Sequence, residues 1–129
     1  MKLRIHENSI RLRLNRKEVA QFAANARLEQ ALEWGSGPQD RLVYGLEASE
    51  SASEVTVRCS GQSIVIILPA ALAQTWTSSD RVEVAADVSV AEKHLSILVE
   101  KEFRRLHGAK FDPDLYPNPL ESASTTHHE

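Results

Sequence analysis

The chain has 129 residues, of which 42% are hydrophobic and 26% charged, and its net charge is −3. These values are typical of one soluble domain with enough apolar residues for a packed core. They argue against nucleic acid as the main partner, since such binding rests on a large basic surface, and no apolar run is long enough to span a bilayer. The one cysteine, Cys59, fits a reducing compartment. We therefore expect a cytoplasmic protein that binds neither nucleic acid nor membrane.

Apolar and basic residues alternate over residues 1–17. This period of two is typical of half-buried strands, and it continues on both sides of the polar link Glu7-Asn8-Ser9. The pattern predicts a β-hairpin with one apolar and one basic face. The apolar face holds Leu3, Ile5, Ile10, Leu12 and Leu14, and the basic face holds Lys2, Arg4, Arg11 and Arg13.

A short helix and a second hairpin are expected next. Asn15 followed by Glu18 is a capping-box pattern, and it predicts a helix over about 16–25 with Phe22 toward the core. The runs 27–34 and 41–48 flank the turn residues 35–38 and predict two strands. The spacing of Leu28 and Leu32 also permits a helix over the first run.

The remaining chain is predicted to form strands over 55–59, 64–68, 81–85 and 94–103, with a loop over 87–93. A helix over about 70–76 follows Pro69, which we place at its first position. No internal repeat is visible beyond the recurring rhythm of hairpins. A single core should contain apolar side chains from every part of this pattern: Leu12, Leu14, Phe22, Ile64, Ile66, Leu72, Trp76, Ile97 and Val99.

Short links between neighbouring strands favour antiparallel pairing. The predicted fold class is therefore α+β, with a strongly bent or partly closed antiparallel β-sheet of about seven to eight strands and two short helices. We expect residues 1–120 to form a single domain. The small, polar residues 121–129 predict a disordered tail.

Several segments resemble an uncharacterised family of small bacterial proteins, a domain of unknown function. They are Lys2 to Ile5, Asn8 to Leu14, Leu68-Pro69-Ala70 with Trp76, Ser79-Asp80, Leu98 to Phe103 and Tyr116 to Pro119. The resemblance covers positions 1 to about 119. Family members often carry a cysteine shortly after the segment that ends at Phe103, and this chain has none there. The resemblance implies one domain, supplies no catalytic residues that carry over to this chain, and leaves the function open.

The basic face has two interpretations. Lys2, Arg4, Arg11 and Arg13 form an anion site if their side chains converge, because arginine binds phosphate in a bidentate manner. They form cross-strand ion pairs if they face the glutamates of neighbouring strands, and such pairs contribute about 0.2–1 kcal/mol each. The candidate partners are Glu29, Glu33, Glu47, Glu83, Glu100 and Glu102. We prefer the ion-pair interpretation.

Other candidate sites are weaker. His107, Asp112 and Asp114 are metal-ligand types, but their spacing matches no metal template, and a solvated turn is preferred. Cys59 has no histidine near it in sequence, and no catalytic motif occurs, so we assign no catalytic residue, metal or cofactor. The segment Tyr116-Pro117-Asn118-Pro119 either binds a partner or, as we prefer, packs on its own domain.

The leading functional hypothesis is a small cytoplasmic binding or interaction module without catalysis. Its partner is an unknown protein or a second copy of the chain, paired as a homodimer through a sheet edge. The alternative is an anion- or phosphate-handling enzyme or ligand-binding domain. In that case Lys2, Arg4, Arg11 and Arg13 bind the ligand, and Glu100 or Glu102 acts as base or metal ligand.

Overall fold

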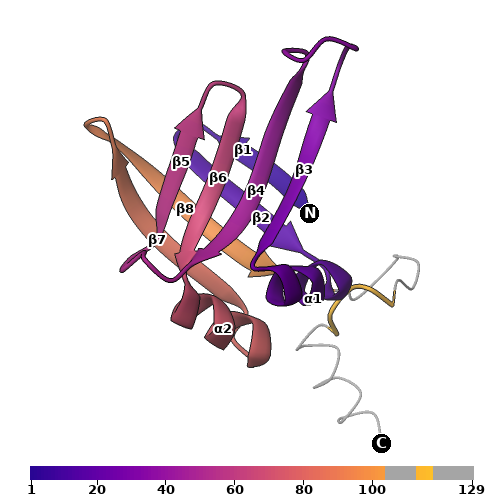
Figure 1. Ribbon diagram of the computed structural model, residues 1–129. Coiled ribbons are helices and arrows are strands. Elements are labelled where there is room, and N and C mark those ends of the chain that lie inside the picture. Colours follow the sequence, from indigo (N-terminus) through magenta and orange to yellow (C-terminus); the bar gives the residue numbers. More distant parts are fainter. Residues whose placement is uncertain (104–112, 118–129) are drawn as a thin grey trace, which may run out of the picture.

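The computed structural model describes residues 1–103 and 113–117. It is mostly β-sheet with two helices, as shown in Figure 1. The elements in chain order are β1 (Lys2–His6), β2 (Ser9–Leu14), α1 (Arg16–Asn25), β3 (Arg27–Glu33), β4 (Arg41–Ser49), β5 (Thr56–Ser60), β6 (Ser63–Pro69), α2 (Ala70–Ser78), β7 (Glu83–Val90) and β8 (Lys93–Lys101).

The strands form two separate four-stranded sheets, in the orders β1-β2-β8-β7 and β3-β4-β6-β5. We call them sheet A and sheet B. Sequence neighbours pair as antiparallel hairpins, as predicted, but β2 pairs with β8 and β4 with β6 in parallel. The predicted single antiparallel sheet is therefore wrong. The parallel contacts join strands that are distant in sequence, and a local pattern contains no sign of such pairing.

Local signals placed most elements correctly. The capping box is present, because Glu18 N donates to Asn15 Oδ1 at 2.9 Å and Asn15 N donates to Glu18 Oε1 at 3.0 Å. Pro69 was misplaced by one position, since it is the N-cap of α2 and not its first residue. The predicted loop over 87–93 is also wrong. There β7 and β8 form a hairpin through Ala91 and Glu92, which both have positive φ, as the tight turns of hairpins require.

The order of elements repeats. Residues 2–49 fold as strand, strand, helix, strand, strand, and residues 56–101 follow the same order. Equivalent residues of the two halves are separated by the same number of positions along the chain. The equivalent pairs are Glu7 and Gly61, which both have positive φ in the first turn of their half, Leu12 and Ile66, and Phe22 and Trp76. In this repeat β2 is equivalent to β6 and β4 to β8, so the parallel pairs β2–β8 and β4–β6 are equivalent to each other. The structure thus contains a pseudo-two-fold repeat that was not predicted from the sequence.

The core lies between the two sheets, and α1 and α2 close one end of it, as Figure 1 shows. Most side chains of the predicted core are buried there: Leu12, Leu14, Phe22, Ile66, Trp76, Ile97 and Val99. Ile64 and Leu72 pack against this cluster with partial exposure. The alternation of residue types along β2 and β8 therefore assigned the buried face correctly.

Candidate functional site

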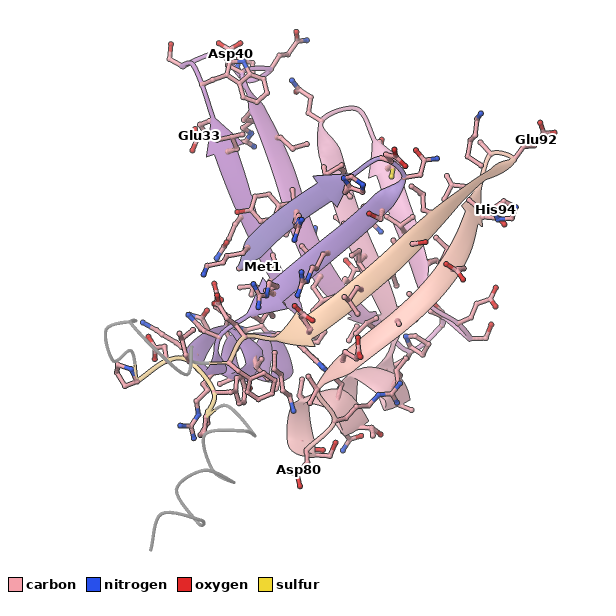
Figure 2. The ribbon with its side chains drawn as sticks, turned by 180° about the vertical axis from the view of Figure 1, so that it is seen from behind. Met1, Glu33, Asp40, Asp80, Glu92 and His94 are labelled. Atoms are coloured by element: carbon pink, nitrogen blue, oxygen red, sulfur yellow. The ribbon has the colours of Figure 1, made fainter. Side chains whose placement is uncertain are left out.

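The predicted basic face is the outer face of sheet A, which Figure 2 shows from the side opposite to Figure 1. Lys2 lies opposite Arg13 and Arg4 lies opposite Arg11 in the β1–β2 hairpin. Leu3, Leu12 and Leu14 alternate with these residues and point toward the core. The structure therefore brings all four predicted site residues to one surface.

Three of the four cations are bound to carboxylates of the chain. Arg11 Nε donates to Glu100 Oε1 at 2.7 Å, and Arg13 Nε lies 2.9 Å from the same oxygen. Lys2 pairs with Glu102, which is buried. The side chain of Glu100 is only 13% exposed, so the two arginines, rather than solvent, compensate most of the charge of this carboxylate. The contacts agree with the ion-pair interpretation of the basic face.

Arg4 differs from the other three cations. In the part of the chain that the structure describes it has no ion pair, and it lies at a groove of about 560 Å³ on the outer face of sheet A. Ala85 and Leu98 give the groove an apolar floor, while His6 and Arg11 line it with basic groups. Asp87 also lines the groove and accepts a hydrogen bond from Ser96 Oγ at 3.1 Å. The groove is of mixed charge and contains one unpaired arginine.

The weaker candidates gain little support. His107 and Asp112 lie outside the described residues, and the backbone oxygen of Asp114 accepts a hydrogen bond from Arg16 N at 2.6 Å. Within residues 1–103 and 113–117, no three His, Cys, Asp or Glu side chains gather as metal ligands would. Cys59 is an exposed free thiol on β5.

Tyr116 packs on its own chain. It pairs with Phe103 in a parallel bridge, and its ring meets the Phe103 ring edge-on at 5.8 Å. Its backbone N–H donates to Glu102 O at 2.8 Å. For Tyr116, the preferred packing interpretation is therefore confirmed, whereas Asn118 and Pro119 lie outside the described residues.

Lys101 is a buried amine beside Tyr116. Its Nζ donates to Ser79 O at 2.6 Å and lies 5.8 Å from the Trp76 ring centroid and 5.6 Å from that of Tyr116. Burial lowers the pKa of Lys101, and the charge of Asp80 partly opposes this effect. These contacts satisfy the ammonium group inside the fold, so Lys101 has a structural role.

A second surface lies between β1, an edge strand of sheet A, and β3, an edge strand of sheet B. At the opposite side of the sandwich, the equivalent strands β5 and β7 are in contact, whereas β1 and β3 make no comparable contact. A cavity of about 360 Å³ is found here, lined by Met1, Lys2, Leu3, Leu32, Leu42 and Tyr44. We call this surface, between β1 and the β3–β4 hairpin, the open side.

The open side exposes large apolar side chains. Ile5 follows Leu3 on the inward face of β1 and is 54% exposed, while Leu32 on β3 is 59% exposed. Trp34 directly follows the last residue of β3, two positions after Leu32, and it is 62% exposed. The tip of the β3–β4 hairpin, next to which Leu32 and Trp34 lie in the sequence, extends past the rest of its sheet in Figure 1. This surface was not predicted from the sequence, although Leu32 and Trp34 shared the apolar phase of the run 27–34.

Polar contacts seal the inner end of the open side. The α-amino group of Met1 pairs with Glu18, and Gln30 Nε2 donates to Glu18 Oε2 at 3.1 Å. Tyr44 Oη donates to Met1 O at 3.3 Å. Burial lowers the pKa of the amino group, and the charge of Glu102 opposes the shift. These contacts hold the start of β1 against α1, β3 and β4.

A family of unknown function, DUF7009, has a model that matches residues 1–120, and the chain belongs to that family. The resemblance to an uncharacterised family is therefore confirmed. No curated protein and no solved structure matches the chain. In the described residues, neither helix is long and apolar enough to cross a membrane.

Proposed function

Because the family has no known function, we propose from the geometry that the protein is a small, cytoplasmic, non-catalytic interaction module whose binding surface is the open side. The observation that carries this proposal is the exposure of Ile5, Leu32 and Trp34 beside β1, an edge strand that has no second partner strand in the described residues. Large apolar side chains gathered on one surface are typical of protein-binding sites.

The edge strand β1 supports the same proposal. In the part of the chain that the structure describes, β1 has a hydrogen-bonded neighbour on one side only, so every second residue directs its N–H and C=O away from β2. Such an edge accepts a strand of another protein. Charged residues on an edge discourage indiscriminate pairing, and Lys2 and Arg4 provide them. The edge is therefore suited to a selective partner.

A second candidate function is anion binding in the groove on the outer face of sheet A. The specific observation in its favour is Arg4, which is unpaired among the described residues and lies beside His6 and Arg11. We rank it second, since the neighbouring cations are already bound to Glu100 and Glu102.

Selection of peptides from a random display library on the immobilised protein tests the binding surface. We expect the selected peptides to lose binding to the Trp34→Ser variant. The control variant is Val82→Ser, since Val82 is 38% exposed and precedes β7 at the opposite edge of sheet A. Peptides that bind the Trp34→Ser variant normally but lose binding to Arg4→Ala would refute the open side and favour the groove.

A further inference from the structure

The proposed function does not specify the binding partner. The charges of β1 and β3, the two edge strands that border the open side, indicate which partner fits. Resting on that function, we infer that the open side binds a second copy of the chain, with β1 of each copy facing β3 of the other. The resulting homodimer has two equivalent contacts and covers Ile5, Leu32 and Trp34 of both copies.

The two edges that border the open side carry opposite charge. β1 presents Lys2, Arg4 and His6, whereas β3 presents Glu29 and Glu33 beside Arg27. Arg27 is already occupied, because its Nε donates to Glu29 Oε1 at 2.8 Å and its guanidinium pairs with Glu47. Arg4 and Glu33 have no ion pair in the described part of the chain. One cation and one carboxylate therefore remain free on the two facing edges.

Two kinds of two-fold pairing are available to such a surface. One kind sets β1 against β1 and β3 against β3. It brings Arg4 toward Arg4 and Glu33 toward Glu33, and like charges on facing strands are destabilising. The other kind sets β1 against β3 twice and places unlike charges together at both contacts. Electrostatic complementarity favours the second kind and suppresses the first.

Symmetry closes this assembly at two copies. Both edges border the same open side of one chain, so a single two-fold axis satisfies both contacts. Among the described residues, the other two edge strands, β5 and β7, contact each other on the opposite side of the sandwich. The apolar side chains of the open side then lie at the centre of the interface, where burial contributes most to binding.

Charge reversal on the full chain tests the inference, with molecular mass in solution as the measurement. The unmodified protein should have the mass of two chains. Arg4→Glu and Glu33→Lys should each shift the mass to that of one chain, since each reversal places like charges at both contacts. An equimolar mixture of the two variants should recover the mass of two chains, because every contact then joins unlike charges again. Glu50→Lys is the control, since Glu50 is exposed outside β1 and β3.

Two results would overturn the inference. One is an unmodified protein that stays at the mass of one chain at all concentrations. The other is a mixture of the two reversed variants that does not associate. If selected peptides still depend on Trp34 in either case, the open side remains the binding surface and only the second copy is wrong. A circular dichroism spectrum equal to that of the unmodified protein confirms that each variant is folded.

Discussion

Phe22 of α1 and Trp76 of α2 meet edge-on, with ring centroids 6.3 Å apart and an angle of 61° between the planes. They occupy equivalent positions of α1 and α2 in the two halves of the chain. Both are almost fully buried. The contact therefore joins the two halves across the pseudo-two-fold axis.

Replacement of either ring should weaken the whole fold. We expect Phe22→Ala to lower the free energy of unfolding by about 3–5 kcal/mol, because a large buried side chain leaves a cavity. In a double-mutant cycle with Phe22→Leu and Trp76→Leu, the two rings should show a coupling of about 0.5–1.5 kcal/mol. Urea denaturation measures both quantities. Additive effects of the two leucine substitutions would show that the rings do not interact.

The N-cap of α1 provides a local test. Asn15→Ala should lower the free energy of unfolding by about 0.5–2 kcal/mol, since the backbone N–H of Glu18 loses its acceptor, Asn15 Oδ1. Thermal denaturation followed by circular dichroism measures the change. Gln21→Ala, on the exposed face of the same helix, should have little effect. Equal effects of the two substitutions would argue against a role of the cap.

The pairing of Arg11 and Arg13 with Glu100 predicts non-additive effects. Either arginine alone can compensate the carboxylate, so Arg11→Gln and Arg13→Gln should each cost about 0–1 kcal/mol. The double variant should cost more than the sum, because Glu100 is nearly enclosed and is left unpaired. Chemical denaturation of the three variants measures the difference. A strictly additive result would mean that solvent already compensates Glu100.

Phosphate distinguishes the two candidate functions. With three of the four cations paired internally, we expect millimolar phosphate or polyphosphate to leave the melting temperature unchanged. A ligand that binds the folded state would raise it by linkage. Differential scanning fluorimetry with and without Arg4→Gln is the measurement. A rise that depends on Arg4 and shrinks with added salt would promote the groove to the leading site.

Lys101 predicts a rise of stability with pH. Its amine has a pKa of 10.5 in the unfolded chain, and burial lowers that pKa in the fold. Between the two values the unfolded state binds more protons, so the free energy of unfolding increases as the pH rises toward 10.5. Lys101→Met should remove this increase. Urea denaturation over that pH range measures the slope, and an unchanged slope in the variant would assign the effect to another group.

Tyr116 lies beside Lys101 and has the opposite effect at still higher pH. Burial raises the pKa of its hydroxyl above the ordinary value of 10.0, and the charge of Arg16 partly opposes the shift. Above pH 10.0 the folded state retains the proton longer, so stability falls as the pH rises. Comparison of Lys101→Met with Tyr116→Phe therefore separates the two contributions.

Some features of the molecule follow from short stretches of sequence. The limits of α1 were predictable because Asn15 and Glu18 interact within one turn of helix. The inward faces of β2 and β8 were predictable because alternation of residue types along a strand records which side is buried. Pairing of the basic face with glutamates of other strands was predictable, since Arg11 and Glu100 lay on outward positions of their strands.

Other features depend on contacts between residues far apart in the chain. Nothing within β2 indicates that Leu12 lies beside Val99 of β8, or that the two strands run parallel. The division into two sheets and the open side at β1 and β3 follow from that pairing. By itself the sequence determined the local elements and their buried faces, because capping and alternation act over a few residues. Only the tertiary structure decided which apolar residues, Trp34 among them, remain uncovered, because exposure depends on which distant strand lies alongside.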